Sequence, residues 1–83
     1  MRITLKMFAS LGDYLPAGHH NNQINLDVPE GTSIMTILET NAIPLKLVHL
    51  VLVNGTYIEP EDRITRPLKE GDVLALWPPV AGG

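Results

Sequence analysis

A single segment of this 83-residue chain carries helical periodicity long enough to cross the face of a sheet. Its apolar side chains recur at three- and four-residue spacing and form one stripe, made of Ile34, Ile37, Leu38 and Ala42. Thr32 or Ser33 stands where an N-cap is expected, and the helix has to end before Pro44. Strand-like segments precede and follow this helix in the sequence. The pattern therefore predicts one helical crossover between two groups of strands.

Two strand-like segments precede the helix. Met1–Phe8 and Gln23–Val28 have apolar residues at every second position, which predicts two half-buried strands paired as a hairpin. Between them, Ala9–Leu15 has the spacing of one or two helical turns. Pro16–Asn22 consists of turn-forming residues and predicts an exposed, mobile loop.

Three further strands are predicted after the helix. Val48–Val53 is an almost unbroken apolar run rich in β-branched residues, which favours a central strand. Asn54-Gly55 is a strong hairpin signal because both residues tolerate positive φ, and Tyr57–Ile58 then forms a short returning strand. Lys69–Asp72 predicts a turn that leads into the last strand, Val73–Trp77.

The order of these elements predicts an α+β fold, a mixed sheet wrapped on one helix in the manner of a ubiquitin-like β-grasp roll. The alternation directs a set of apolar side chains toward the helix: Ile3, Leu5, Ile37, Leu38, Leu74 and Leu76. Val73, Ala75 and Trp77 then lie on the opposite face. Trp77 is either part of an exposed docking patch with Val73 or a side chain shielded by a neighbouring loop, and the sequence leaves both open.

Composition excludes several classes of protein. The net charge of −3 argues against a nucleic-acid binder, which usually carries a basic stripe. No apolar run is long enough to span a bilayer, so we expect no membrane segment and a cytoplasmic protein. The absence of cysteine excludes disulfides and thiolate metal sites within this sequence.

The histidines and the acid–base segment Glu59–Arg66 are further candidates for functional sites. His19 and His20 are adjacent, and adjacent side chains rarely bind the same ion, so we expect a solvated loop and no metal site. His49 lies in an apolar run and is expected to be a sheet residue. Glu59–Arg66 mixes acids and bases without an enclosing pocket, which predicts a solvated connection and not a catalytic carboxylate pair.

The last six residues carry the strongest functional signal. Pro78 and Pro79 lack backbone N–H groups, so the final strand has to stop, and residues 1–77 are predicted to form the domain from which residues 78–83 extend as a flexible tail. Gly82 and Gly83 have no side chain and suit a narrow channel. The hypothesis is that the carboxylate of Gly83 is the functional group.

The sequence resembles the MoaD/ThiS family of ubiquitin-like sulfur carriers along almost its whole length. The matching segments are Phe8-Ala9-Ser10-Leu11, Pro29-Glu30-Gly31-Thr32, Val53-Asn54-Gly55, Leu68-Lys69-Glu70-Gly71-Asp72 and Pro78-Pro79-Val80-Ala81-Gly82-Gly83. Only the last of these is specific by itself. Within the family, the Pro-Pro-Val lead before the two glycines is most similar to the small subunit of molybdopterin synthase.

The resemblance implies a cycle in which this chain is a sulfur-donating subunit, not catalytic alone, and binds no cofactor. A ubiquitin-activating-type enzyme, using its own ATP and magnesium, would adenylate Gly83, and a persulfide sulfur donor would convert it to a thiocarboxylate. The tail would then enter the large catalytic subunit of molybdopterin synthase and donate sulfur for the molybdenum cofactor. Trp77, Pro78, Pro79, Val80, Ala81 and Gly82 would bind partners.

Other outcomes of the same chemistry stay open at this point. The thiocarboxylate could serve thiamin, a tungsten cofactor or another sulfur-containing product. A ubiquitin-like modifier would instead join Gly83 to a lysine through an isopeptide bond. A pure interaction module would make no use of the terminal carboxylate.

Overall fold

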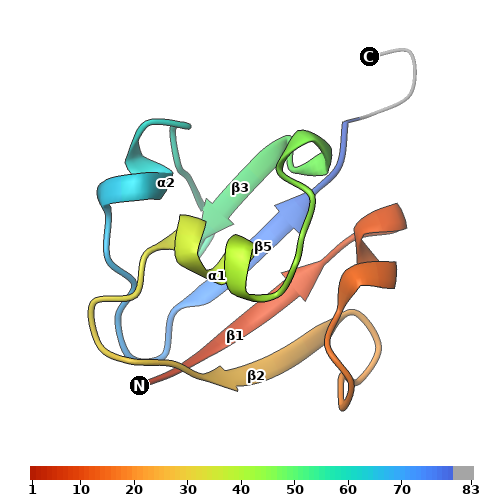
Figure 1. Cartoon of the computed structure of the whole chain (residues 1–83), viewed down its shortest axis with the longest axis horizontal. Helices are drawn as coiled ribbons and strands as arrows, with labels where there is room; N and C mark the ends of the chain where they lie inside the picture. Colours follow the sequence, from red (N-terminus) through yellow and green to blue (C-terminus); the bar gives the residue numbers. More distant parts are fainter. Residues whose placement is uncertain (80–83) are drawn as a thin grey trace.

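The computed structural model describes residues 1–79, and these form a mixed sheet of five strands with helices on one face (Figure 1). The strands are β1 (Arg2–Met7), β2 (Gln23–Asp27), β3 (Leu50–Val53), β4 (Thr56–Tyr57) and β5 (Val73–Trp77). The helices are α1 (Ile34–Thr40), α2 (Asp62–Thr65) and two 3-10 helices, η1 (Ala9–Tyr14) and η2 (Leu45–Leu47). The predicted α+β order is therefore confirmed.

The strands lie in the order β2-β1-β5-β3-β4. β1 pairs antiparallel with β2 and parallel with β5, and β3 pairs antiparallel with both β5 and β4. The middle strand is thus β5, and the prediction of a central strand at Val48–Val53 needs correction. β3 begins only at Leu50 and lies next to the short edge strand β4.

Helix α1 forms as its sequence predicts. Ser33 is the N-cap, with extended backbone angles and a side-chain oxygen that accepts the N–H of Thr36 at 3.2 Å. Ala42 was predicted to extend the apolar stripe, but it lies beyond the helix, is exposed and has a φ of 55°. The positive φ of Ala42 changes the direction of the chain, and the next residue, Ile43, is buried in the core in its place.

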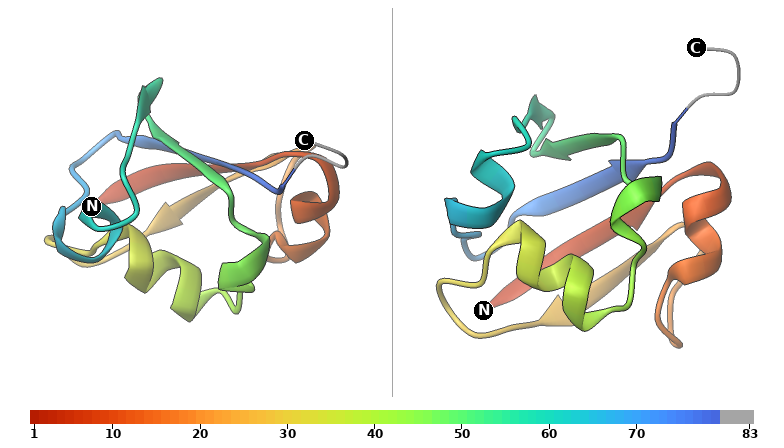
Figure 2. Two further views of the ribbon diagram at one scale, coloured as in Figure 1. Left: turned by 90° about the horizontal axis from the view of Figure 1, so that it is seen from above. Right: turned by 45° about the horizontal axis from the view of Figure 1, so that its top comes forward.

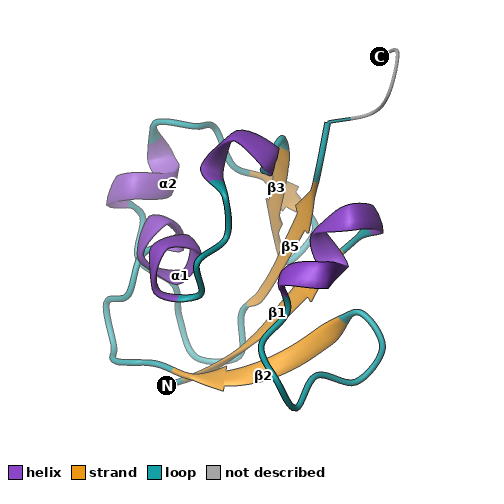
Figure 3. Cartoon of the chain, turned by 45° about the vertical axis from the view of Figure 1, so that its right-hand side comes forward, coloured by secondary structure: helices purple, strands orange, loops and turns teal. Residues whose placement is uncertain are grey.

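The core lies between α1 and one face of the sheet (Figure 2). All six side chains predicted to face the helix are at most 2% exposed: Ile3, Leu5, Ile37, Leu38, Leu74 and Leu76. Figure 3 shows α1 and α2 on the same side of the sheet. The opposite face, called the outer face below, has no helix over it in the described part of the chain.

Both predicted turns after the helix are confirmed. Asn54 and Gly55 have φ of 51° and 83°, as a two-residue hairpin turn with two positive φ angles requires. In the second turn the N–H of Lys69 donates to Asp72 Oδ2 at 2.9 Å, and Gly71 has a φ of 83°. A side-chain bond of 2.9 Å from Asn54 Nδ2 to Asp72 Oδ1 joins the two turns.

The loop before β2 is exposed at His19 and His20, as predicted. It closes as a tight hairpin in which His20 and Gln23 exchange backbone bonds of 2.9 and 3.2 Å, and Asn21 adopts a φ of 56°. His19 Nδ1 lies 3.0 Å from the carbonyl oxygen of Asn21. His49 is also exposed and lies directly before β3.

The prediction that Glu59–Arg66 is only a solvated connection is wrong. Part of it forms α2, and Arg63 is 8% exposed. Its Nε and Nη2 donate to the carbonyl oxygen of Ile58 at 3.2 and 3.1 Å, and Nη2 lies 3.5 Å from that of His49. The guanidinium is buried because carbonyl oxygens replace its hydration, a pairing that composition does not reveal.

Leu38→Ala should lower the free energy of unfolding by about 2–5 kcal/mol, because it leaves a cavity between α1 and the sheet. Chemical denaturation followed by circular dichroism measures this. Ile64→Ala is the matched control, because Ile64 is 62% exposed and should leave the unfolding curve nearly unchanged. Equal losses in the two variants would contradict the assigned core.

Arg63→Met keeps the long side chain but removes the bonds to the carbonyl oxygen of Ile58. That buried acceptor then lacks its partner, so we expect a loss of about 1–3 kcal/mol in the free energy of unfolding. Arg66→Met, at an exposed position of the same segment, should change little. A neutral Arg63→Met variant would show that the guanidinium bonds contribute no net stability.

Candidate functional site

The end of β5 is held on both sides by backbone hydrogen bonds. The N–H of Phe8 donates to the carbonyl oxygen of Leu76 at 3.1 Å, and the N–H of His49 donates to that of Trp77 at 2.9 Å. Pro78 and Pro79 follow directly and supply no N–H for a ladder, and Pro79 is exposed. The strand therefore stops where the sequence predicts, with its last carbonyl anchored.

The remaining predicted site residues, Val80, Ala81, Gly82 and Gly83, lie outside the described residues. What the structure places is the point from which they continue. β5 runs parallel to β1 and antiparallel to β3, so that point lies beside the end of β1 and the start of β3 (Figure 1).

Trp77 stacks on Phe8 at this end of the sheet. The ring centroids are 4.3 Å apart and the planes differ by 3°. Both side chains are half-buried and project from the outer face. The two interpretations of Trp77 left open by the sequence are thus combined: one side of the indole is shielded by Phe8, and the ring still contributes to an apolar surface.

That surface continues across β5, β3 and β4. The pairing of Leu50 with Trp77, and of Leu52 with Ala75 and Tyr57, places these side chains on the outer face. Tyr57 is 44% exposed, whereas Ala75 is buried beneath its larger neighbours. We define the outer apolar surface as Phe8, Leu50, Leu52, Tyr57, Val73 and Trp77.

The sequence prediction named Trp77 and Val73 but missed the other four members. Phe8 is out of phase with the core residues of β1, which indicates an outward side chain. Leu50 and Leu52 alternate with the buried Val51 and Val53. The apolar run Val48–Val53 is therefore unbroken because both faces of β3 carry apolar side chains, and not because β3 is the middle strand.

The other half of the outer face, over β1 and β2, is polar. Arg2 donates from Nε to Asp27 Oδ1 at 3.0 Å and from Nη2 to Oδ2 at 3.3 Å. These hydrogen bonds, and then the attraction between the charges, lower the pKa of Asp27 and raise the pKa of Arg2. Both side chains are exposed, so the pair adds little stability. Thr4 and Lys6, which pair with Val73 and Ala75, mark where the apolar surface ends.

Within residues 1–79, His, Asp and Glu side chains form no group of three or more that could hold a metal ion. In the same part of the chain, no helix is both long and apolar enough to cross a bilayer. The anchored end of β5 lies beside the outer apolar surface, an arrangement suited to docking on a partner.

Comparisons with known proteins identify a family and a fold. The family model described as the ThiS family matches residues 16–83. No curated protein matches significantly. Among solved structures, the chain is similar to SAMP1 from Haloferax volcanii, with a TM-score of 0.71 and 25% identity over 100% of both chains.

Two further structures have the same fold. The Haloferax volcanii HVO 2177 protein gives a TM-score of 0.75 and 24% identity over 100% of this chain and 87% of that one. A chain from the complex of subunits 1 and 2 of molybdopterin-converting factor from Helicobacter pylori gives 0.62 and 22%, over 100% of both chains. The predicted ubiquitin-like β-grasp fold is thereby confirmed.

Phe8→Ala should expose the second side of the Trp77 indole to water. Since Trp77 is the one tryptophan of the chain, its fluorescence emission should shift to longer wavelength, and the stacked pair should account for a loss of about 0.5–1.5 kcal/mol beyond the lost burial. Tyr14→Ala, a truncation of an exposed aromatic residue in η1, serves as control and should leave the emission unchanged. An unshifted spectrum in Phe8→Ala would contradict the stack.

Proposed function

The chain belongs to the ThiS family, and from that premise we propose that it is a sulfur carrier whose Gly83 carboxylate is converted to a thiocarboxylate for molybdopterin biosynthesis. The observation that carries the proposal is the family match through residue 83, which includes the diglycine. The anchored end of β5, directly before Pro78, gives that diglycine a rigid base.

The chemistry assigned to Gly83 follows from the reactivity of a carboxylate. An ionised carboxylate is a poor acyl donor because it has no good leaving group. Adenylation by a ubiquitin-activating-type enzyme joins the carboxylate to AMP and releases pyrophosphate from ATP, with the magnesium held by that enzyme. The terminal sulfur of a persulfide donor then attacks the carbonyl carbon and displaces AMP, and reduction of the resulting acyl disulfide by a thiol releases the thiocarboxylate.

The tail residues have distinct parts in this proposal. Gly82 and Gly83 present no Cβ, so the backbone can enter a narrow active site. Pro78 and Pro79 restrict φ and reduce the entropy that the segment loses when it docks. Val80 and Ala81 join the two parts and would contact the channel wall.

The outer apolar surface is the proposed docking site for both partners, the adenylating enzyme and a large catalytic subunit. The outer apolar surface lies beside the end of β5, from which the tail continues. One docking geometry can therefore present the surface and the tail to the same partner. Aromatic side chains such as Trp77 and Tyr57 are enriched among the residues that dominate binding energy. The similar Helicobacter pylori chain was solved in a complex of subunits 1 and 2, which supports a partner of this kind.

Intact mass spectrometry tests the proposal directly. The chain should gain the mass of one sulfur minus one oxygen when incubated with an adenylating enzyme, ATP and a persulfide donor. A chain lacking Gly83 should gain nothing, while its thermal unfolding curve stays nearly unchanged. Tyr57→Asp should reduce the rate of the gain by placing a charge on the docking surface, whereas Lys6→Asp, on the polar half of the same face, should reduce it far less.

The alternative functions predict different masses for the product of this reaction. Adducts of higher mass on lysines would indicate a protein modifier, and no change with any activating enzyme would indicate an interaction module. Sulfur transfer to a molybdopterin precursor in the presence of a large synthase subunit distinguishes this pathway from thiamin or another product.

A further inference from the structure

The two edges of the sheet differ in how they are protected. β4 forms one edge and is only two residues long, which leaves little ladder for another strand. β2 forms the other edge and pairs with β1 through five consecutive residue pairs without a bulge. It contains neither lysine nor proline, two residues that commonly protect sheet edges. β2 is therefore the open edge of the described sheet.

The hydrogen-bond pattern identifies which backbone groups this edge offers. Val28 and Met1 exchange bonds of 2.8 and 2.7 Å at one end of the β1–β2 ladder. Bonded pairs alternate with non-bonded pairs in an antiparallel ladder, so the non-bonded pairs are those that contain Asn25 and Asp27. The backbone N–H and C=O groups of these two residues point away from β1, toward the edge.

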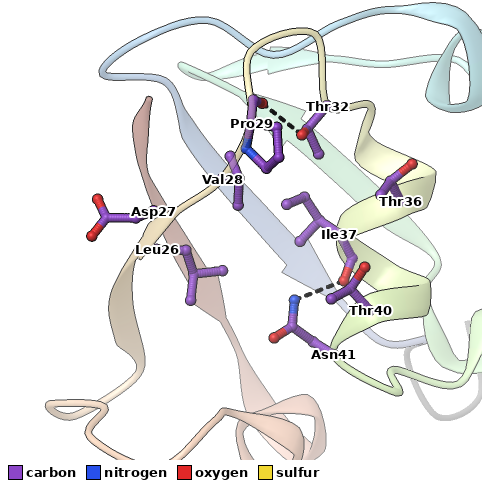
Figure 4. Close-up of a pocket in the computed structure, with 9 residues that line it drawn as sticks. All are labelled: Leu26, Asp27, Val28, Pro29, Thr32, Thr36, Ile37, Thr40 and Asn41. Atoms are coloured by element: carbon purple, nitrogen blue, oxygen red, sulfur yellow. Dashed lines mark hydrogen bonds between the residues drawn. The ribbon is translucent and has the colours of Figure 1, made fainter.

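A groove of about 340 Å³ lies beside this edge, between β2 and α1 (Figure 4). Leu26 and Ile37 face one another across it, and Val28 contributes to its apolar wall. The Asp27 side chain points away from it. Leu26 and Val28 are only half-buried although they lie on the core side of the sheet. The helix thus leaves part of this face uncovered.

The polar groups around the groove are largely paired within the chain. Thr32 Oγ1 donates to the carbonyl oxygen of Pro29 at 2.6 Å, and Asn41 Nδ2 donates to that of Ile37 at 2.8 Å (Figure 4). A polar small molecule would find few free donors here. The groove suits an aliphatic side chain, and the adjacent strand edge suits an extended backbone.

We propose that an extended segment of a partner protein adds to β2 as a further strand and inserts aliphatic side chains into the groove between β2 and α1. Backbone bonds to Asn25 and Asp27 would hold the segment, and its residue opposite Leu26 would point into the groove. The residues on either side would point to the outer face, where Asp27 is already paired with Arg2 and the net charge of −3 on this chain favours threonine, lysine or arginine over acidic residues.

A second copy of this chain fits the edge less well than such a segment. In a symmetric β2–β2 pairing, Leu26 would lie opposite Leu26 of the other copy, so each groove would receive one leucine and each Asn25 would lie opposite an Asp27. The net charge of −3 on each copy adds repulsion. An extended segment with aliphatic residues fills the groove and carries no such cost.

This site is independent of the proposed sulfur chemistry. The groove lies on the face covered by α1, whereas the outer apolar surface lies on the opposite face. A protein that holds β2 therefore leaves Phe8 and Trp77 free to dock elsewhere. The segment would tether the carrier without occupying the strand end from which residue 80 continues.

Selection from a displayed library of extended heptapeptides provides the probe. The library alternates Val, Ile or Leu with Thr, Lys or Arg, and the full chain is the bait. Enriched peptides should shift the amide resonances of β2 and α1 in nuclear magnetic resonance titrations. N-methylation of the peptide amides that face β2 should weaken binding about tenfold or more, because it removes at least two hydrogen bonds, whereas methylation of the amides that face away should not.

Two variants of the chain complete the test. Thr40→Phe places a large ring in the groove and should abolish binding, while Glu39→Phe adds the same ring at the neighbouring exposed position that does not line the groove and should bind normally. The proposal is overturned if no peptide is enriched, if both methylated peptides bind equally, or if the shifts lie outside β2 and α1. Sedimentation that shows a dimer lost in Thr40→Phe would overturn it in favour of a second copy.

Discussion

The parallel pairing of β1 with β5 is the constraint on which the rest of the structure depends. It joins the beginning of the chain to the last strand in the described residues, with register from Thr4 and Val73 to Met7 and Leu76. Parallel neighbours need a crossover, and α1 supplies it on one face of the sheet. The same pairing brings Phe8 beside Trp77, because both follow the last paired residues and point outward. The stack and the anchored end of β5 are thus consequences of one ladder.

The two faces of the sheet have different surroundings, and the alternation along β3 shows this most clearly. Val51 and Val53 complete the core, whereas Leu50 and Leu52 extend the outer apolar surface. A half-exposed apolar face lowers solubility unless a partner covers it. The presence of such a face beside the end of β5 is consistent with a docking role. The Arg2–Asp27 pair and the polar residues of β1 and β2 limit this surface on one side.

The open edge at β2 and the docking face at β5 are separated by the sheet itself. Short strand length closes the β4 edge, but nothing in the described chain covers Asn25 and Asp27 of β2. The groove between Leu26 and Ile37 exists because α1, of seven residues, is too short to cover the whole inner face. A carrier that meets several partners in turn benefits from surfaces that do not overlap.

The sequence by itself determined the elements that rest on local chemistry. Period-two alternation, a helix cap at Thr32 or Ser33, the positive φ of Asn54 and Gly55 and the strand end before the prolines all act within a few residues, and each was predicted. Only the tertiary structure decided which strand is central, that Arg63 is buried against the carbonyl oxygen of Ile58, and that Phe8 stacks on Trp77. These features join residues that are distant in the chain or replace water around a charge. Their energies therefore depend on neighbours that no local pattern specifies.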